Sequence, residues 1–212
     1  MFTPPEVLET HVRWLLELGY RFMTAGELAA EWRDGDEPPP GVAVLTFDDG
    51  WRDGLITATP LLEWLGIRAT FYVCPNGFGK RFPRFGPEAA ILTRDEARAL
   101  HDAGMELGSH TFSHPDLREL SDSELEREVV ESRQVVESLT GEPCLTLAYP
   151  SGLYDGRVKR AARRAGYELA LDCKPAPWDR FAAPRWQPPP TTDAEAVGRK
   201  LELPFEESLT LG

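Results

Sequence analysis

Short apolar, β-prone runs alternate along this chain with segments of helical period. The run VAVLTF at residues 42–47 reads as a strand buried on both faces, and four more runs follow at residues 69–73, 105–109, 145–149 and 167–172. Strands that alternate with helices form right-handed βαβ units, so the pattern predicts a largely parallel sheet. A further strand is expected near residues 181–186. About five to seven strands favour an α/β fold of the distorted, incomplete (β/α) barrel type over a full eight-stranded barrel.

Capping motifs mark the predicted starts of three helices. The pattern S/T-x-x-E, in which each side chain can bond a backbone N–H group of the other residue, begins at Thr24, Thr93 and Ser121. An opening helix is also expected, because apolar residues recur near a 3.6-residue period until Gly19. The helix after Ser121 is expected to bury one apolar face: Leu125, Val129, Val136 and Leu139.

The charge of the chain limits its partners. With 35 acidic and 23 basic residues, the formal net charge is −12. This balance argues against nucleic acid or an anionic membrane as the main partner, because both attract basic surfaces. No apolar run reaches the ~20 residues that a membrane-spanning helix needs.

The opening residues and the cysteines indicate the cellular compartment in which the protein is expected. The segment MFTPPEVLETHVRWLLELGY has no basic part followed by an apolar one, so no signal peptide is visible and a cytoplasmic protein is expected. If the natural chain begins earlier, an extracytoplasmic location is expected instead. The cysteines are odd in number and widely spaced, and we expect reduced, buried thiols at Cys74, Cys144 and Cys173.

Polar clusters follow the predicted strands. The sequence DDG follows the run at residues 42–47, and HTFSH follows the run at residues 105–109. Because active sites of parallel sheets gather at the carboxyl ends of strands, these clusters are expected to meet. Imidazole and carboxylate together suit zinc or a neighbouring divalent metal. Taken alone, DDG is equally well a turn, and two histidines four residues apart are more often surface residues.

Asp48 and Asp49 can serve one site only if the chain leaves strand geometry between them. Neighbouring residues of a strand point to opposite faces of the sheet. Gly50 follows directly and makes a turn easy at this point. We therefore expect a break in the strand at the DDG sequence.

Three motifs together resemble the NodB-homology polysaccharide deacetylases, carbohydrate esterase family four. TFDDG at 46–50 and SHTFSHPDL at 109–117 are similar to the first two motifs, and LAYPSG at 147–152 is similar to the third motif of the poly-N-acetylglucosamine deacetylase branch. The resemblance implies the distorted (β/α) barrel and a single deacetylase domain over residues 1–212. It also implies metal-dependent hydrolysis of N-acetyl groups from an N-acetylglucosamine-containing polysaccharide or a small acetylated sugar.

The resemblance implies a role for each residue of the first two motifs. Asp48 becomes the general base, and the metal ligands are Asp49, His110 and His114. The implied cofactor is one divalent metal ion, zinc in the first place, with cobalt or nickel as alternatives. Such an ion polarises an acetyl carbonyl and lowers the pKa of bound water, whose proton Asp48 would remove.

Residues of the third motif and of the C-terminal region are candidates for substrate binding. A backbone N–H near Ser151 is expected to hold the oxyanion, while Tyr149 and Pro150 are expected to shape the wall of the groove. Trp178 is the favoured tryptophan for stacking on a sugar ring, and Trp51 is a further candidate.

Two parts of the family pattern are displaced. Ala148 stands where many members have an arginine that bonds the catalytic aspartate, and Arg185 is expected to replace it, as a later arginine does in the poly-N-acetylglucosamine branch. The general-acid histidine has no evident counterpart, because no histidine follows His114 and both His11 and His101 fall in predicted helices. The simplest interpretation is that the family's first strand is absent from this chain.

Two other functions stay open. The first is an amidohydrolase of the same fold that acts on a non-sugar amide, because fold and metal do not fix the substrate. The second is a metal-holding glycan-binding protein without turnover, which the missing acid suggests. The sequence indicates no protein partner.

Overall fold

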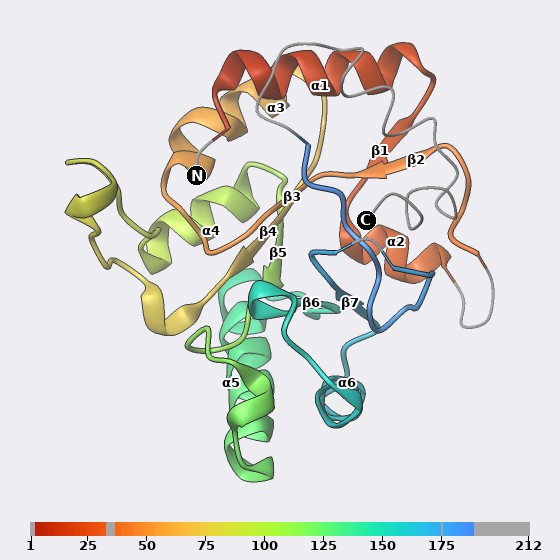
Figure 1. Ribbon diagram of the computed structural model, residues 1–212. Coiled ribbons are helices and arrows are strands. Elements are labelled where there is room, and N and C mark those ends of the chain that lie inside the picture. Colours follow the sequence, from red (N-terminus) through yellow and green to blue (C-terminus); the bar gives the residue numbers. More distant parts are fainter. Residues whose placement is uncertain (1–2, 33–36, 175, 189–212) are drawn as a thin grey trace.

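A computed structural model describes residues 3–32, 37–174 and 176–188 (Figure 1). Its centre is a curled half-barrel of parallel strands with helices packed around it, which confirms the predicted distorted (β/α) barrel. A two-stranded sheet pairs β1 (Arg21–Met23) with β2 (Val42–Val44). The larger sheet has five strands in chain order: β3 (Thr46–Phe47), β4 (Thr70–Val73), β5 (Glu106–Ser109), β6 (Thr146–Ala148) and β7 (Leu169–Leu171).

Helices connect the strands, and their starts follow the capping signals. The capping boxes at Thr24, Thr93 and Ser121 are all formed, with bonds in both directions. The α-helices are α1 (Pro5–Glu17), α2 (Ala25–Glu31), α3 (Thr59–Leu65), α4 (Arg94–Asp102), α5 (Asp122–Thr140) and α6 (Gly156–Arg164). A π-helical turn, η1 (Gly54–Ala58), precedes α3, and short 3-10 helices lie at η2 (Pro75–Gly77), η3 (Pro83–Phe85), η4 (Leu117–Glu119) and η5 (Pro150–Gly152).

Helix α5 buries the apolar face that its sequence predicts. Its four predicted core residues are each 5% exposed or less: Leu125, Val129, Val136 and Leu139. They share a core cluster with strand residues such as Phe71 and Leu147. Full burial of one such side chain contributes roughly 1.5–3 kcal/mol, so contacts of this kind fix the helices against the outer face of the half-barrel.

Two expectations about strands need correction, and one strand was not expected. Residues 42–47 are half-buried, because they border a cavity of about 470 Å³ that is also lined by α1. They are interrupted at Leu45, where the pairing changes from β1 to β4. The short strand β1 was not predicted, since three residues are too few to show a period. The strand expected near residues 181–186 is a single parallel bridge between Leu171 and Ala183.

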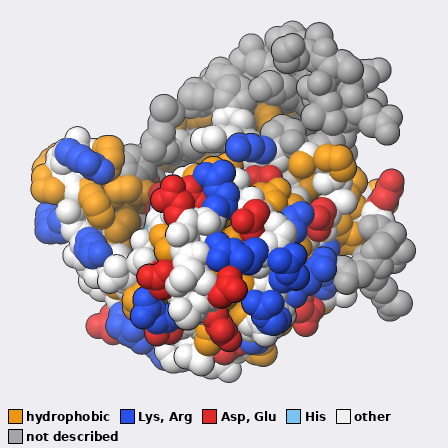
Figure 2. Space-filling view, turned by 60° about the horizontal axis from the view of Figure 1, so that its bottom comes forward, with side chains coloured by type: hydrophobic (Ala, Val, Ile, Leu, Met, Phe, Trp, Pro, Cys, Tyr) orange, Lys and Arg blue, Asp and Glu red, His pale blue; other side chains and the backbone are white. Residues whose placement is uncertain are grey.

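The surface differs between regions. On the face shown in Figure 2, Lys and Arg side chains are interspersed with Asp and Glu, while hydrophobic side chains gather on the lobe at the left of the view. Among the described helices, none combines the length and apolar character needed to cross a bilayer.

Candidate metal centre and catalytic site

The two aspartates of the DDG sequence reach one site because the backbone turns between them. Asp49 and Gly50 have φ values of 68° and 71°, in the left-handed region. A non-glycine residue pays roughly 1–2 kcal/mol for this conformation, and aspartate tolerates it better than most. The turn is held by the N–H of Leu92, which donates to the Gly50 carbonyl at 2.9 Å. The break in strand geometry is therefore present, as expected.

His110 is fixed by the neighbouring strand. It follows β5, its side chain is 2% exposed, and its Nδ1 lies 2.7 Å from the carbonyl oxygen of Ala148 at the end of β6. A carbonyl only accepts, so Nδ1 carries the proton and donates, and Nε2 keeps its lone pair for a ligand. The ring thus has the tautomer and orientation of a metal ligand.

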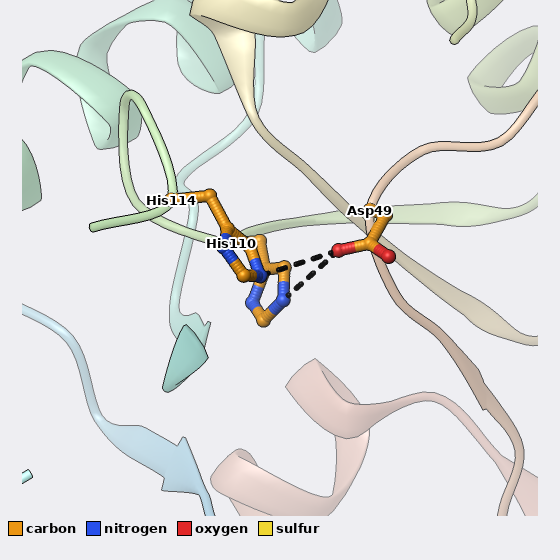
Figure 3. A group of neighbouring side chains, drawn as sticks. All are labelled: Asp49, His110 and His114. Atoms are coloured by element: carbon orange, nitrogen blue, oxygen red, sulfur yellow. Dashed lines mark ion pairs between the residues drawn. The ribbon is translucent and has the colours of Figure 1, made fainter. Parts of the chain in front are cut away.

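His114 joins the same site through a tight turn. Thr111 and His114 both have left-handed φ values, 64° and 62°, and the His114 N–H donates to Thr111 Oγ1 at 3.1 Å. The two imidazole rings meet edge to face with centroids 4.9 Å apart. Figure 3 shows both rings directed at the carboxylate of Asp49.

The three donors fit a tetrahedral divalent cation. Asp49 Oδ1 lies 3.5 Å from His110 Nε2 and 3.4 Å from His114 Nε2. Bonds of 2.0–2.1 Å in a tetrahedral zinc site place neighbouring ligand atoms ~3.3 Å apart, close to these separations. Trp51 Nε1 donates to the second oxygen, Asp49 Oδ2, at 3.2 Å and so orients the carboxylate. Contact with the His110 imidazole holds the pKa of Asp49 below its usual range, against the effect of burial.

Asp48 lies beside this triad and pairs with Arg185. Arg185 Nη1 and Nη2 are 2.7 Å from Asp48 Oδ1 and Oδ2, and Arg185 Nε donates to the carbonyl of Asp172 at 2.7 Å. Burial by itself would raise the pKa of Asp48, but the bond from Arg185 and the nearby His110 outweigh it and hold the pKa below its usual range. Asp48 is therefore ionised and oriented 4.0 Å from His110 Nε2.

Comparison with known proteins identifies the family to which this chain belongs. The sequence model of the family described as polysaccharide deacetylase matches residues 35–170, more than half of the chain. The chain belongs to the polysaccharide deacetylase family. The resemblance carried by the three motifs is thereby confirmed.

Individual relatives agree with this family assignment. The putative polysaccharide deacetylase YxkH of Bacillus subtilis is 25% identical over 203 residues, which cover 94% of this chain and 70% of that protein. The peptidoglycan-N-acetylglucosamine deacetylase of Bacillus cereus is 31% identical over 134 residues, 61% of this chain and 55% of that protein. The structure of the Streptococcus pyogenes deacetylase PplD in complex with acetate shares the fold, with a TM-score of 0.80 and 24% identity over 94% of this chain and 87% of that one.

The residues of the third motif, at 147–152, are buried except for Ser151. Tyr149 is fully buried, its hydroxyl donates to the Phe181 carbonyl at 3.0 Å, and its ring stacks on Tyr154. Pro150 is buried as well, whereas Ser151 is exposed with a left-handed φ of 55°. Tyr149 thus has no exposed surface of its own, and the substrate-binding roles of Tyr149, Pro150 and Ser151 stay predictions.

Trp178 lies away from the strand ends that carry the candidate metal triad. Its ring is 5.9 Å from that of Trp32, just beyond α2. Two residues later, Arg180 Nε donates to the carbonyl of Glu168, which directly precedes β7. Asp49, His110 and His114 follow the opposite, carboxyl ends of the strands, so a contact between Trp178 and the reacting sugar stays a prediction.

The cavity of about 470 Å³ also contains Asp53, which the sequence did not single out, and His11, which was set aside as a residue of a predicted helix. Asp48, Asp49 and Arg185 line it together with His11 from α1 and Asp53. His11 is 7% exposed, and burial raises the pKa of Asp53. The signal for His11 was its place on the apolar face of the opening helix, three residues after Leu8 and four before Leu15.

Proposed function

We propose that this chain hydrolyses the N-acetyl group of an N-acetylglucosamine-containing glycan or a small acetylated sugar, using one divalent metal ion. Zinc is the preferred metal, with cobalt and nickel as alternatives. The observation that carries the proposal is the carboxylate of Asp48, held ionised by Arg185 beside a three-ligand set. The glycan substrate is supported by the family and by the N-acetylglucosamine deacetylase among the relatives.

The residues divide the work of amide hydrolysis among them. A cation held by Asp49, His110 and His114 would polarise the acetyl carbonyl and lower the pKa of a bound water. Asp48 takes the proton of the attacking water, which is a general-base role of the kind that contributes roughly 10²–10⁴-fold in rate. The bidentate bond from Arg185 keeps Asp48 unprotonated and aimed at the site.

Two further steps need groups outside the ligand set. We assign the oxyanion contact to the backbone N–H at Ser151, in the left-handed turn after β6. The leaving amine needs a proton, and among the described lining residues His11 and Asp53 are the candidates to supply it. This pair bears on the open alternative of a glycan-binding protein without turnover, because the cavity does contain titratable side chains besides the base.

The test is acetate release from N-acetylated chitotetraose. We expect release that stops with a chelator, returns with added zinc, and is lost in Asp48→Asn while zinc affinity, measured by titration calorimetry, is retained. Turnover by Asp48→Asn at the wild-type rate would exclude Asp48 as the base. Tight glycan binding without acetate release would favour the glycan-binding alternative, and activity confined to non-sugar acetamides would favour the amidohydrolase.

A further inference from the structure

Three aromatic rings form a connected cluster at the edge of the metal site. Trp51 meets Phe82 and Phe85 edge to face, with centroid separations of 5.5 Å and 5.8 Å, and the two phenylalanine rings lie 6.5 Å apart. Phe82 and Phe85 belong to the loop between β4 and α4, whereas Trp51 follows Asp49 by two residues. We call Trp51, Phe82 and Phe85 the aromatic shelf.

Backbone bonds fix this loop against the DDG turn. Trp51 forms an antiparallel bridge with Ile91, and the Arg52 N–H donates to the Ala90 carbonyl at 2.9 Å. Within the loop, the Phe82 N–H donates to the Ala89 carbonyl at 2.8 Å. The shelf is thus held in a defined position relative to the metal ligands.

The shelf is continuous with the catalytic cavity. Trp51 bonds the metal ligand Asp49 through Nε1, so its indole lies directly beside the predicted reaction centre. A second hollow of about 500 Å³ is lined by Trp51, Phe85 and Ile56. It shares Trp51, Asp53 and Thr57 with the catalytic cavity, so the two hollows adjoin.

Phe85 is the exposed member of the shelf, with the Arg84 guanidinium 4.6 Å from its ring centroid, whereas Trp51 and Phe82 are half-buried. Phe85 is 55% exposed and Ile56 is 56% exposed, and an exposed apolar patch beside a site is more informative than a buried one. Figure 2 shows hydrophobic side chains gathered on the left-hand lobe, where Figure 1 places the loop between β4 and α4. The carboxylates of Asp53 and Glu88 also line the hollow and can accept hydrogen bonds from hydroxyl groups.

We propose that the aromatic shelf binds a second sugar ring of the substrate, next to the ring whose acetyl group is removed. A pyranose has an apolar face of C–H groups that suits an aromatic ring and a polar rim that suits carboxylates. Continuity with the catalytic cavity makes the occupant a further ring of the same glycan. This inference rests on the proposed function and deepens it: the substrate is an oligomer or polymer, and the shelf gives it preference over a single acetylated sugar.

Binding measurements on a variant without turnover test the shelf separately from the chemistry. In the Asp48→Asn background with zinc present, calorimetry would compare N-acetylated chitotetraose with N-acetylglucosamine. We expect tetramer affinity to fall about five- to tenfold in Phe85→Ala and to be largely retained in Phe85→Tyr, with monomer affinity unchanged. Trp64→Ala is the matched control, since Trp64 is an exposed aromatic residue of α3 at 66% exposure.

Three results would overturn the shelf. They are tetramer affinity unchanged in Phe85→Ala, equal loss of monomer and tetramer affinity, and a parent protein that binds tetramer no better than monomer. Failure of the proposed function looks different. In that case the parent binds tetramer in a Phe85-dependent way, while the wild-type chain releases no acetate.

Discussion

Arg185 directs both terminal nitrogens at the carboxylate of Asp48, 2.7 Å from each oxygen, across 137 residues of sequence. Its remaining nitrogen donates to the carbonyl of Asp172 at the end of β7, so the guanidinium is fixed at both sides. Planar, two-point contact of this kind is a property of arginine that lysine cannot reproduce. The pair therefore links the first motif of the deacetylase to the segment after the last strand.

Removal of the arginine should change how activity depends on pH. In the wild-type chain the pKa of Asp48 lies below its usual value, so the carboxylate is ionised at neutral pH. The stability gained from the pair is present above the unfolded pKa of Asp48 and is lost as pH falls through the lowered folded pKa. In Arg185→Met the guanidinium no longer offsets the effect of burial, so the pKa of Asp48 rises. We therefore expect the acid limb of the kcat/KM profile to move up by about one pH unit or more.

The measurement is the pH profile of acetate release. Arg13→Met is the control, because Arg13 pairs with Glu9 on the surface of α1. An acid limb that stays in place in Arg185→Met would show that Arg185 does not set the ionisation of Asp48.

Trp51 should affect metal affinity through Asp49. Its indole N–H is the donor to Asp49 Oδ2, and Trp51→Phe keeps an aromatic ring but removes that donor. Loss of such an orienting partner costs roughly 10–100-fold in metal affinity, and we expect zinc titration to show a decrease in this range. Trp64→Phe, in exposed surface, should leave affinity unchanged. A twofold change or less in Trp51→Phe would contradict the orienting role.

Local signals predicted most of this fold, and long-range packing accounts for what they missed. The three capping boxes form because each needs only two residues that are three apart, and the DDG turn was expected because adjacent strand residues cannot share a face. No spacing rule relates Asp48 to Arg185, which only the resemblance to known deacetylases suggested. The interrupted strand at residues 42–47 was misjudged because its burial depends on the distance to α1, which the sequence does not contain.

The source of the proton for the leaving amine can be found by changing the leaving group. An amine must be protonated to leave, whereas an aryl acetate releases a stable phenolate without an acid. We expect His11→Gln or Asp53→Asn to lose N-deacetylation by roughly 10²-fold or more while it retains hydrolysis of p-nitrophenyl acetate. If both variants keep full N-deacetylation, neither of these cavity residues supplies the proton.

Alanine substitutions at two glycines should distinguish the cost of backbone strain from the cost of a steric clash. Gly141 and Gly152 have φ values of 75° and 62°, so alanine is strained at both. At Gly141 a Cβ would meet nothing within 4 Å, whereas at Gly152 it would lie 2.5 Å from Asp172 Oδ1 and Cys173 Sγ. We expect denaturant unfolding to show a loss of about 1 kcal/mol for Gly141→Ala and a further ~1–3 kcal/mol for Gly152→Ala. Equal losses would mean that the turn after β6 moves aside freely.

Thiol labelling should distinguish the three cysteines. Cys74 and Cys144 are buried, while Cys173 is exposed, which corrects the expectation of three buried thiols. Burial raises the pKa of Cys144 to about 12, and it raises the pKa of Cys74 further. Because the thiolate is the reacting form, we expect iodoacetamide at pH 8 to add a single group, at Cys173.

The same adduct should block the deacetylase. Cys173 lines the catalytic cavity with Asp48 and Arg185, so a carbamidomethyl group would occupy space that the substrate needs. Intact-mass analysis should show one adduct together with a loss of acetate release. Cys173→Ser should remain active, gain no mass and be insensitive to the reagent. Labelling of Cys74 or Cys144 in the folded chain would show that the strand ends around His110 open readily, and full activity after labelling would place the substrate path away from Cys173.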